Sequence, residues 1–133
     1  MSWATKYIGL PYREKGRDRT GLDCWGLVRY VLHEERGLTL PSYTEDYATS
    51  QDTHEIEALM RGEIVSHWTT IAVADAQPFD GIVLRMLGHP IHFGLVVAPP
   101  YFMHALRGAG TVLERWDSLM WQKRVLGAAR WNW

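Results

Sequence analysis

Leu22-Asp23-Cys24-Trp25-Gly26-Leu27-Val28 is the stretch of sequence that decides the fold. Apolar side chains recur at helical spacing from its cysteine onward, which predicts a helix with one buried stripe; these positions are Cys24, Leu27, Val28, Val31 and Leu32. Asp23 is a natural N-cap and Gly37 a natural terminator. We therefore expect Cys24 in the first turn of this helix.

Cys24 is the single cysteine of the chain, which excludes an internal disulfide framework and a multi-cysteine zinc site. Two alternatives remain: an inert buried thiol on the apolar stripe, or a nucleophile. A helix N-terminus lowers the pKa of a thiol, which favours the nucleophile. Gly26 also favours it, because a missing side chain lets a substrate or a neighbouring strand approach closely.

Composition indicates one globular domain over residues 1–133, since 47% of the residues are hydrophobic and 22% are charged. A net charge of -1 argues against a nucleic-acid partner. No apolar run approaches the ~20 residues of a membrane span. Residues 1–10 lack the pattern of a signal peptide, so we expect a protein made in the cytoplasm.

The two halves of the chain differ in periodicity, which predicts an α+β fold with helices first and an antiparallel sheet second. Two irregular segments, at residues 13–20 and 38–52, separate the helices, and residues 65–76 are ambiguous. We expect helices at 2–8 (capped by Ser2), 24–36 and 53–61, a helical turn at 116–122, and strands at 82–87, 91–98, 101–106, 111–114 and 124–130.

A cysteine nucleophile needs a base and a group that orients the base. His92 is the expected base, on the strand face opposite Ile91 and Phe93, where the gap at Gly94 would admit the Cys24 helix. His104, on the next strand, is the expected orienting group. For the two histidines to stand directly opposite each other, the turn must centre near residue 98, whereas a two-residue turn at 99–100 would separate them onto opposite faces.

The remaining histidines give no comparable site. His89 and His92 have the spacing of a metal-binding pair, but no cysteine or acidic residue lies near them in the sequence, so zinc is not favoured. We expect no metal or other cofactor.

The motifs resemble the NlpC family, papain-like cysteine peptidases that cut the stem peptides of peptidoglycan. The similarity covers residues 7–131 and rests on segments 10–12 (Leu-Pro-Tyr), 22–28, 78–83 (Pro-Phe-Asp-Gly-Ile-Val), 92–97 (His-Phe-Gly-Leu-Val-Val) and 103–105 (Met-His-Ala). The order of Asp and Gly in 78–83 is exchanged relative to the family pattern.

The resemblance implies a role for five residues. Cys24 is the nucleophile, His92 the base and His104 the orienting residue. Tyr12 matches a tyrosine that shapes the oxyanion and substrate site, although a core aromatic residue is the alternative. Asp23 matches an acid that can meet the free amine of the stem peptide, and its role as a helix cap is the alternative.

Trp25 is the sixth expected site residue, at the substrate-binding position. It departs from the family, which usually has serine there and uses it to recognise the amino end of the stem peptide. With tryptophan at this position, the sequence resembles a subgroup of the family, the peptidases at the tail tips of phages and gene-transfer particles. That resemblance implies other tail-tip proteins as partners, transport in a virion tail, and action in the periplasm or cell wall. We expect residues 131–133, Trp-Asn-Trp, to form a docking patch.

The sequence therefore predicts a peptidoglycan endopeptidase in which Cys24 attacks an amide carbonyl and His92 carries the proton. Two rivals stay open. One is a structural tail protein that keeps the fold without turnover. The other is an acyltransferase or amidase on the same scaffold.

Overall fold

The helix that begins at Cys24 forms as the sequence predicts. The computed structural model describes residues 3–133, and helix α1 spans Cys24–Arg36. The Asp23 carboxylate accepts a hydrogen bond of 2.8 Å from the Gly26 N–H at its start. The helix ends at Gly37, whose φ of 69° is the left-handed conformation of a C-terminal cap. Cys24 therefore occupies the first turn, as expected.

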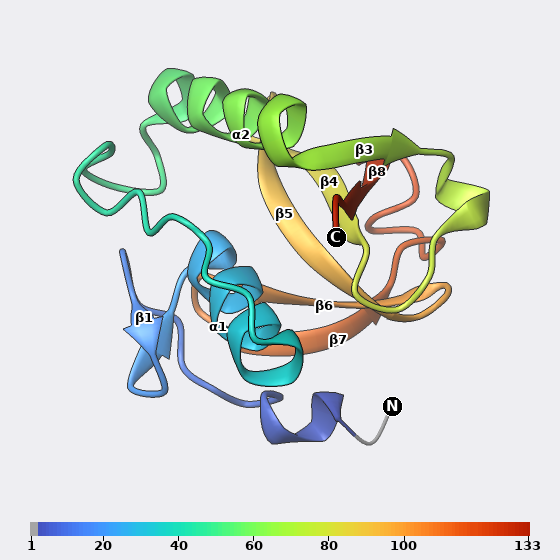
Figure 1. The fold of residues 1–133 in the computed structure, drawn as a ribbon, viewed down its shortest axis with the longest axis horizontal. Coiled ribbons are helices and arrows are strands. Elements are labelled where there is room, and N and C mark those ends of the chain that lie inside the picture. Colours follow the sequence, from blue (N-terminus) through green and yellow to red (C-terminus); the bar gives the residue numbers. More distant parts are fainter. Residues whose placement is uncertain (1–2) are drawn as a thin grey trace.

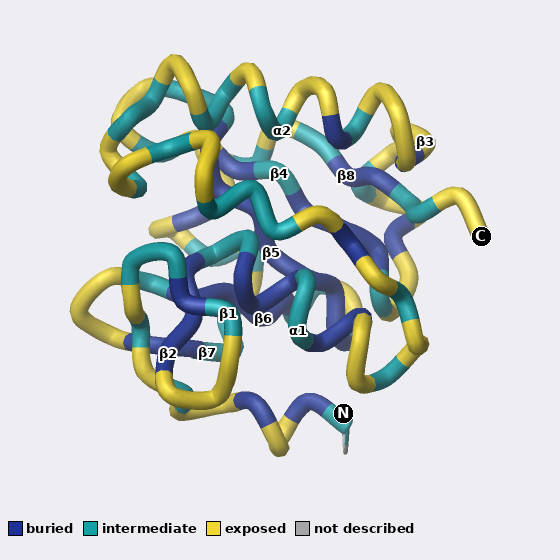
Figure 2. The backbone as a smooth tube through the Cα atoms, turned by 60° about the vertical axis from the view of Figure 1, so that its left-hand side comes forward, coloured by how far each residue is buried: buried dark blue, intermediate teal, exposed yellow. Residues whose placement is uncertain are grey.

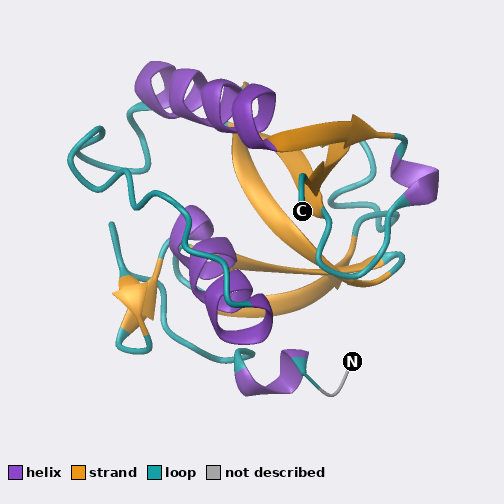
Figure 3. Ribbon diagram, viewed as in Figure 1, coloured by secondary structure: helices purple, strands orange, loops and turns teal. Residues whose placement is uncertain are grey.

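An antiparallel sheet of six strands follows the helices, in the order β3-β8-β4-β5-β6-β7 (Figures 1 and 3). Strands β4 to β7 are consecutive meander neighbours, whereas β8 returns to the far side of β4 and pairs with β3 at the edge. The α+β prediction is confirmed. The strands are β3 (Trp68–Ile71), β4 (Gly81–Met86), β5 (His89–Ala98), β6 (Tyr101–Leu106), β7 (Gly110–Arg115) and β8 (Val125–Trp131).

Several elements differ from the sequence-based expectation. Helix α2, Thr53–His67, continues six residues beyond the predicted end and leads directly into β3. The expected loop at 13–20 contains strand β1 (Arg17–Asp18), which forms a small hairpin with β2 (Gly21–Leu22). Short 3-10 helices occupy Ala4–Lys6 (η1) and Val73–Asp75 (η2), and the predicted cap Ser2 lies outside the described residues. Within residues 3–133, no helix is long and apolar enough to cross a membrane.

Each face of the sheet has its own hydrophobic cluster. Most of the central strands β5 and β6 is buried (Figure 2). The apolar stripe of α1 packs against Phe93, Leu95 and Met103 on one face. The opposite face packs under Trp121, from the segment between β7 and β8. The expectation that α1 enters the gap at Gly94 was wrong: a side chain there would meet the Phe102 ring at 2.7 Å, so β6 fills that space.

The two C-terminal tryptophans differ in how they pack. Trp131 pairs with Trp68 across β8 and β3, and the two indoles pack edge to face at 5.5 Å. Trp131 therefore belongs to the margin of the core, and the docking patch expected over residues 131–133 stays a prediction. Trp133 stays 64% exposed, with the Arg36 guanidinium 4.6 Å from its ring.

The hairpin of β5 and β6 sets the relation between the two histidines. Ala98 pairs with Tyr101, so the turn has two residues, which we expected to separate His92 and His104. The register shifts between Val96 and Ala98, however, because Val97 is an extra bulged residue. The bulge returns both histidines to one face, diagonal to each other instead of directly opposite.

Gly26 allows the loop at residues 13–16 to approach α1. A Cβ atom at this position would lie 2.0 Å from the Gly16 carbonyl oxygen and 3.1 Å from the Asp23 carboxylate. The close neighbours are thus the backbone that leads into β1 and the side chain of Arg17 at the start of β1, not a substrate. The contact fixes the loop against the first turn of the helix.

Gly26→Ala is expected to lower the free energy of unfolding by roughly 1–3 kcal/mol, because the added methyl group overlaps backbone that cannot give way cheaply. Urea denaturation followed by circular dichroism measures the change. Gly62→Ala is the matched control: it lies in α2 with nothing within 4 Å of the added Cβ, so it should stabilise by roughly 0.5–1 kcal/mol. Equal effects of the two variants would contradict the packing argument.

Candidate active site

A cavity of about 260 Å³ lies where the start of α1 meets α2 and the tip of the β4–β5 hairpin. Five of the six residues predicted for the site line it, namely Tyr12, Asp23, Cys24, Trp25 and His92. His104, the sixth, lies beyond His92. The rest of the wall is largely apolar, with Ile56, Leu59 and Met60 contributed by α2.

Cys24 approaches the sheet beside His92. Its Sγ lies 3.9 Å from the carbonyl oxygen of Ile91, the residue that precedes His92 on β5. Burial raises the pKa of the Cys24 thiol to about 12, and the Asp23 carboxylate adds to the rise; the backbone N–H groups of Phe93 and Trp25 oppose it. The predicted lowering by the helix N-terminus was wrong in sign, since loss of water outweighs it.

His92 and His104 form a hydrogen-bonded pair, with 2.7 Å between His92 Nε2 and His104 Nδ1. Both side chains are buried, with 5% of His92 and 0% of His104 exposed. Burial, together with the neighbouring His104, lowers the pKa of His92 to about 3. The resting site therefore holds a neutral imidazole beside a protonated thiol.

Glu114 and Trp121 join this pair and were missed by sequence reasoning. Glu114 Oε2 lies 2.6 Å from His104 Nε2 and accepts a bond of 2.9 Å from the Trp121 indole. Pairing of His104 with Val112 across β6 and β7 puts Glu114 on the same face, diagonal to His104. In the sequence, Glu114 is only an acidic residue within a predicted strand. The register of β6 and β7 is needed to show that it lies next to His104.

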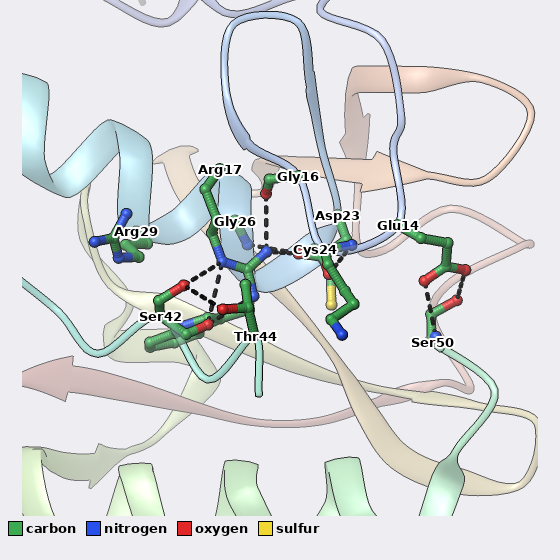
Figure 4. A network of polar contacts seen from close by, with 12 residues as sticks. Glu14, Gly16, Arg17, Asp23, Cys24, Gly26, Arg29, Ser42, Thr44 and Ser50 are labelled. Carbon is green, nitrogen blue, oxygen red and sulfur yellow. Dashed lines mark hydrogen bonds and ion pairs between the residues drawn. The ribbon is translucent and has the colours of Figure 1, made fainter. Parts of the chain in front are cut away.

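Asp23 joins three chain segments through one carboxylate (Figure 4). Besides the Gly26 N–H, it accepts hydrogen bonds from Arg17 Nη1 at 2.7 Å and from the Lys15 N–H at 3.1 Å, and the Tyr47 hydroxyl also donates to it. The cap role is thus present. The amine-binding role stays a prediction, and an incoming ammonium group would have to displace one of these donors.

Tyr12 and Trp25 flank Cys24 in the cavity. Burial raises the pKa of Tyr12 to about 12, so its hydroxyl stays protonated and able to donate. Tyr12 also packs against the core cluster, so both of its proposed roles fit its position. The Trp25 indole donates to the Pro41 carbonyl at 2.8 Å and sets its edge against Phe93, which fixes a rigid aromatic wall.

The other histidines lie apart from this chemistry. His89 Nδ1 contacts Glu57 at 2.9 Å, while His92 contacts His104, so the two residues of the apparent metal-binding pair have different partners. Within the described part of the chain, no cluster of three or more histidine, cysteine or acidic side chains could hold a metal ion.

A thiol at a helix N-terminus, beside a buried histidine pair on an antiparallel sheet, defines a papain-like cysteine peptidase. The model of the NlpC/P60 family matches residues 9–130, and the chain belongs to this family.

Comparisons with known proteins agree on this family. "Probable endopeptidase NlpC" of Escherichia coli K12 is 27% identical over 92% of this chain, which spans 70% of that protein. "Murein DD-endopeptidase MepS/Murein LD-carboxypeptidase" of the same strain is 26% identical over 98% of this chain, which spans 60% of it. In structure, the NlpC/p60 domain of the peptidoglycan hydrolase SagA shares the fold, with a TM-score of 0.66, 23% identity and coverage of 98% of this chain and 94% of that domain.

Because His92 is buried, the free energy of unfolding is expected to decrease as the pH falls below 6.5. Its pKa is about 3 in the folded protein and about 6.5 when unfolded, so below pH 6.5 only the unfolded chain binds this proton. The free energy of unfolding should then drop by up to about 1.4 kcal/mol per pH unit from this group. Urea titrations between pH 6.5 and 4.5 measure the slope.

His92→Asn should remove the share of the slope that His92 contributes and leave the share of His104, whose pKa burial also lowers to about 3. The same change at the exposed His67 should leave the slope as in the wild type. A slope that His92→Asn does not alter would show that His92 takes up its proton in the folded state.

Proposed function

We propose that this chain hydrolyses an amide bond in the stem peptides of peptidoglycan. The observation that carries the proposal is the placement of Cys24 at the start of α1, beside His92, on one cavity of an NlpC/P60 domain. The names of two relatives support the proposal: "Murein DD-endopeptidase MepS/Murein LD-carboxypeptidase" supports the substrate, and "Probable endopeptidase NlpC" supports the reaction.

The proposed reaction follows from the resting state. His92 takes the thiol proton as Sγ of Cys24 attacks the carbonyl carbon, because the imidazole is neutral and the thiol is protonated. The backbone N–H of Cys24, at the helix N-terminus, stabilises the oxyanion. His92 then returns the proton to the leaving amine, and water hydrolyses the thioester. The family precedent is the bond between γ-D-Glu and the diamino acid.

Cys24→Ala is expected to abolish release of peptides from purified murein, because no other thiol exists in the chain to replace the nucleophile. Mass spectrometry of the digest measures both the rate and the bond that is cut. Circular dichroism should show an unchanged fold, since alanine fits the same helical position. A variant that digests murein as fast as the wild type would exclude the mechanism.

Product analysis separates this proposal from its rivals. A peptidase gives fragments with a new carboxylate from water, whereas an acyltransferase gives a product joined to an added amine. A chain that releases no fragment and forms no acyl product would favour the structural role.

We also propose the setting inferred from the sequence, a tail tip in which this enzyme opens the cell wall locally beside other tail proteins. Trp25 after the nucleophile is the feature that supports it. Its test is a particle that carries Cys24→Ala: it should assemble normally and enter cells poorly. Absence of the protein from purified particles would exclude this setting while leaving the enzymatic proposal intact.

A further inference from the structure

The histidine pair continues into a carboxylate at the edge of the sheet. We propose that Glu114 is a positioning residue that fixes the proton pattern of His104 and His92 and stabilises the positive charge they share during thiol attack. This inference rests on the proposed function of Cys24 and His92, and it extends the expected set of three residues to four.

The first argument concerns protons. An ionised carboxylate only accepts hydrogen bonds, so the 2.6 Å contact with Glu114 requires that His104 Nε2 carries a hydrogen. In neutral His104 the other nitrogen, Nδ1, then has a lone pair and accepts from His92 Nε2 at 2.7 Å. His92 Nδ1 is left without a proton. That is the state a general base needs when it receives the proton of Cys24.

The second argument concerns the orientation of Glu114. The Trp121 indole donates to the same oxygen, Oε2, at 2.9 Å, and an indole N–H can only donate. Trp121 is 2% exposed and packs edge to face on His104 with 4.9 Å between ring centroids. The carboxylate is thus held by a rigid buried ring, so its lone pair stays directed at His104.

The third argument concerns charge. When Cys24 loses its proton to His92 Nδ1, a positive charge forms in a pocket that disfavours it, because both histidines are buried. Moving the Nε2 proton of His92 to His104 Nδ1 carries that charge to the ring that contacts Glu114. The S–H bond breaks as an N–H bond forms at His92 Nδ1, and the N–H bond at His92 Nε2 breaks as one forms at His104 Nδ1. The net charge of the four groups, which are the thiol, the two imidazoles and the carboxylate, stays the same. An adjacent carboxylate offsets the cost of this step.

Alkylation of Cys24 by iodoacetamide tests this arrangement without any murein. The reaction breaks the S–H bond, passes the proton to His92, forms an S–C bond and releases iodide. Glu114→Gln keeps an oxygen that can accept from His104 and Trp121 but removes the charge, so the alkylation rate at pH 7 should fall about tenfold. Glu114→Ala also removes the acceptor, and the rate should fall by about 100-fold.

The control is Asp117→Asn, the same carboxylate-to-amide change three residues away. Asp117 pairs with Arg115, at 2.8 Å between Oδ1 and Nε, on the surface, so the alkylation rate should stay at the wild-type value. Long-range ¹⁵N NMR on labelled histidine gives a second readout. The wild type and Glu114→Gln should hold His104 in the Nε2–H form, whereas Glu114→Ala should show a mixture of tautomers.

The outcomes separate this inference from the proposed function. Alkylation in Glu114→Gln within twofold of the wild type, with the same tautomers in Glu114→Ala, would overturn the role of Glu114 even if murein is digested. Suppose instead that the wild type digests no murein, while both Glu114 variants react more slowly with iodoacetamide. This result would refute the proposed substrate and support the positioning role of Glu114. Where murein is digested, Glu114→Gln should lower kcat about tenfold and leave KM unchanged.

Discussion

The Asp23 carboxylate is the constraint on which the site depends. It caps α1 and at the same time binds the Arg17 side chain, the backbone of Lys15 and the hydroxyl of Tyr47. Arg17 in turn holds the Ser42 carbonyl at 2.7 Å. The hairpin before the helix and the irregular segment after it are therefore attached to the turn that carries the nucleophile. A buried carboxylate with this many donors keeps its charge compensated, which is why an acidic residue is tolerated there.

Burial and not the helix terminus controls the resting chemistry. A helix N-terminus favours a thiolate, but its effect is confined to about one turn and is modest beside the cost of placing a charge away from water. Cys24 and His92 consequently stay neutral until a substrate provides a carbonyl to attack. Such a site protects its thiol from adventitious oxidation, because the thiolate is the reactive form.

The sequence was sufficient for elements with strong local signals. Helix α1 was predictable because its cap, stripe and terminator agree, and β6 was predicted with its observed bounds at residues 101–106. Strand β3 was missed because it forms by pairing with β8, where Trp68 lies opposite Trp131, far along the chain. Non-local pairing of this kind leaves no periodic mark in a short segment.

The candidate site shows the same limit. Local motifs identified Cys24, His92 and His104, but the face on which α1 packs required knowledge of which side chain fills the space beside Gly94. Glu114 lies ten residues from its partner His104 and meets it through the register of two strands. The spacing of residues in the sequence does not define the tertiary structure that brings these side chains together.

The bulge at Val97 has a consequence for the lengths that this hairpin can adopt. Side chains alternate between the faces of a strand, so deletion of a single residue near the turn would move either His92 or His104 to the wrong face. The β5–β6 connection can therefore gain or lose an even number of residues, or an odd number where a second bulge compensates. Relatives with insertions should carry them in other loops, or insert an even number of residues here.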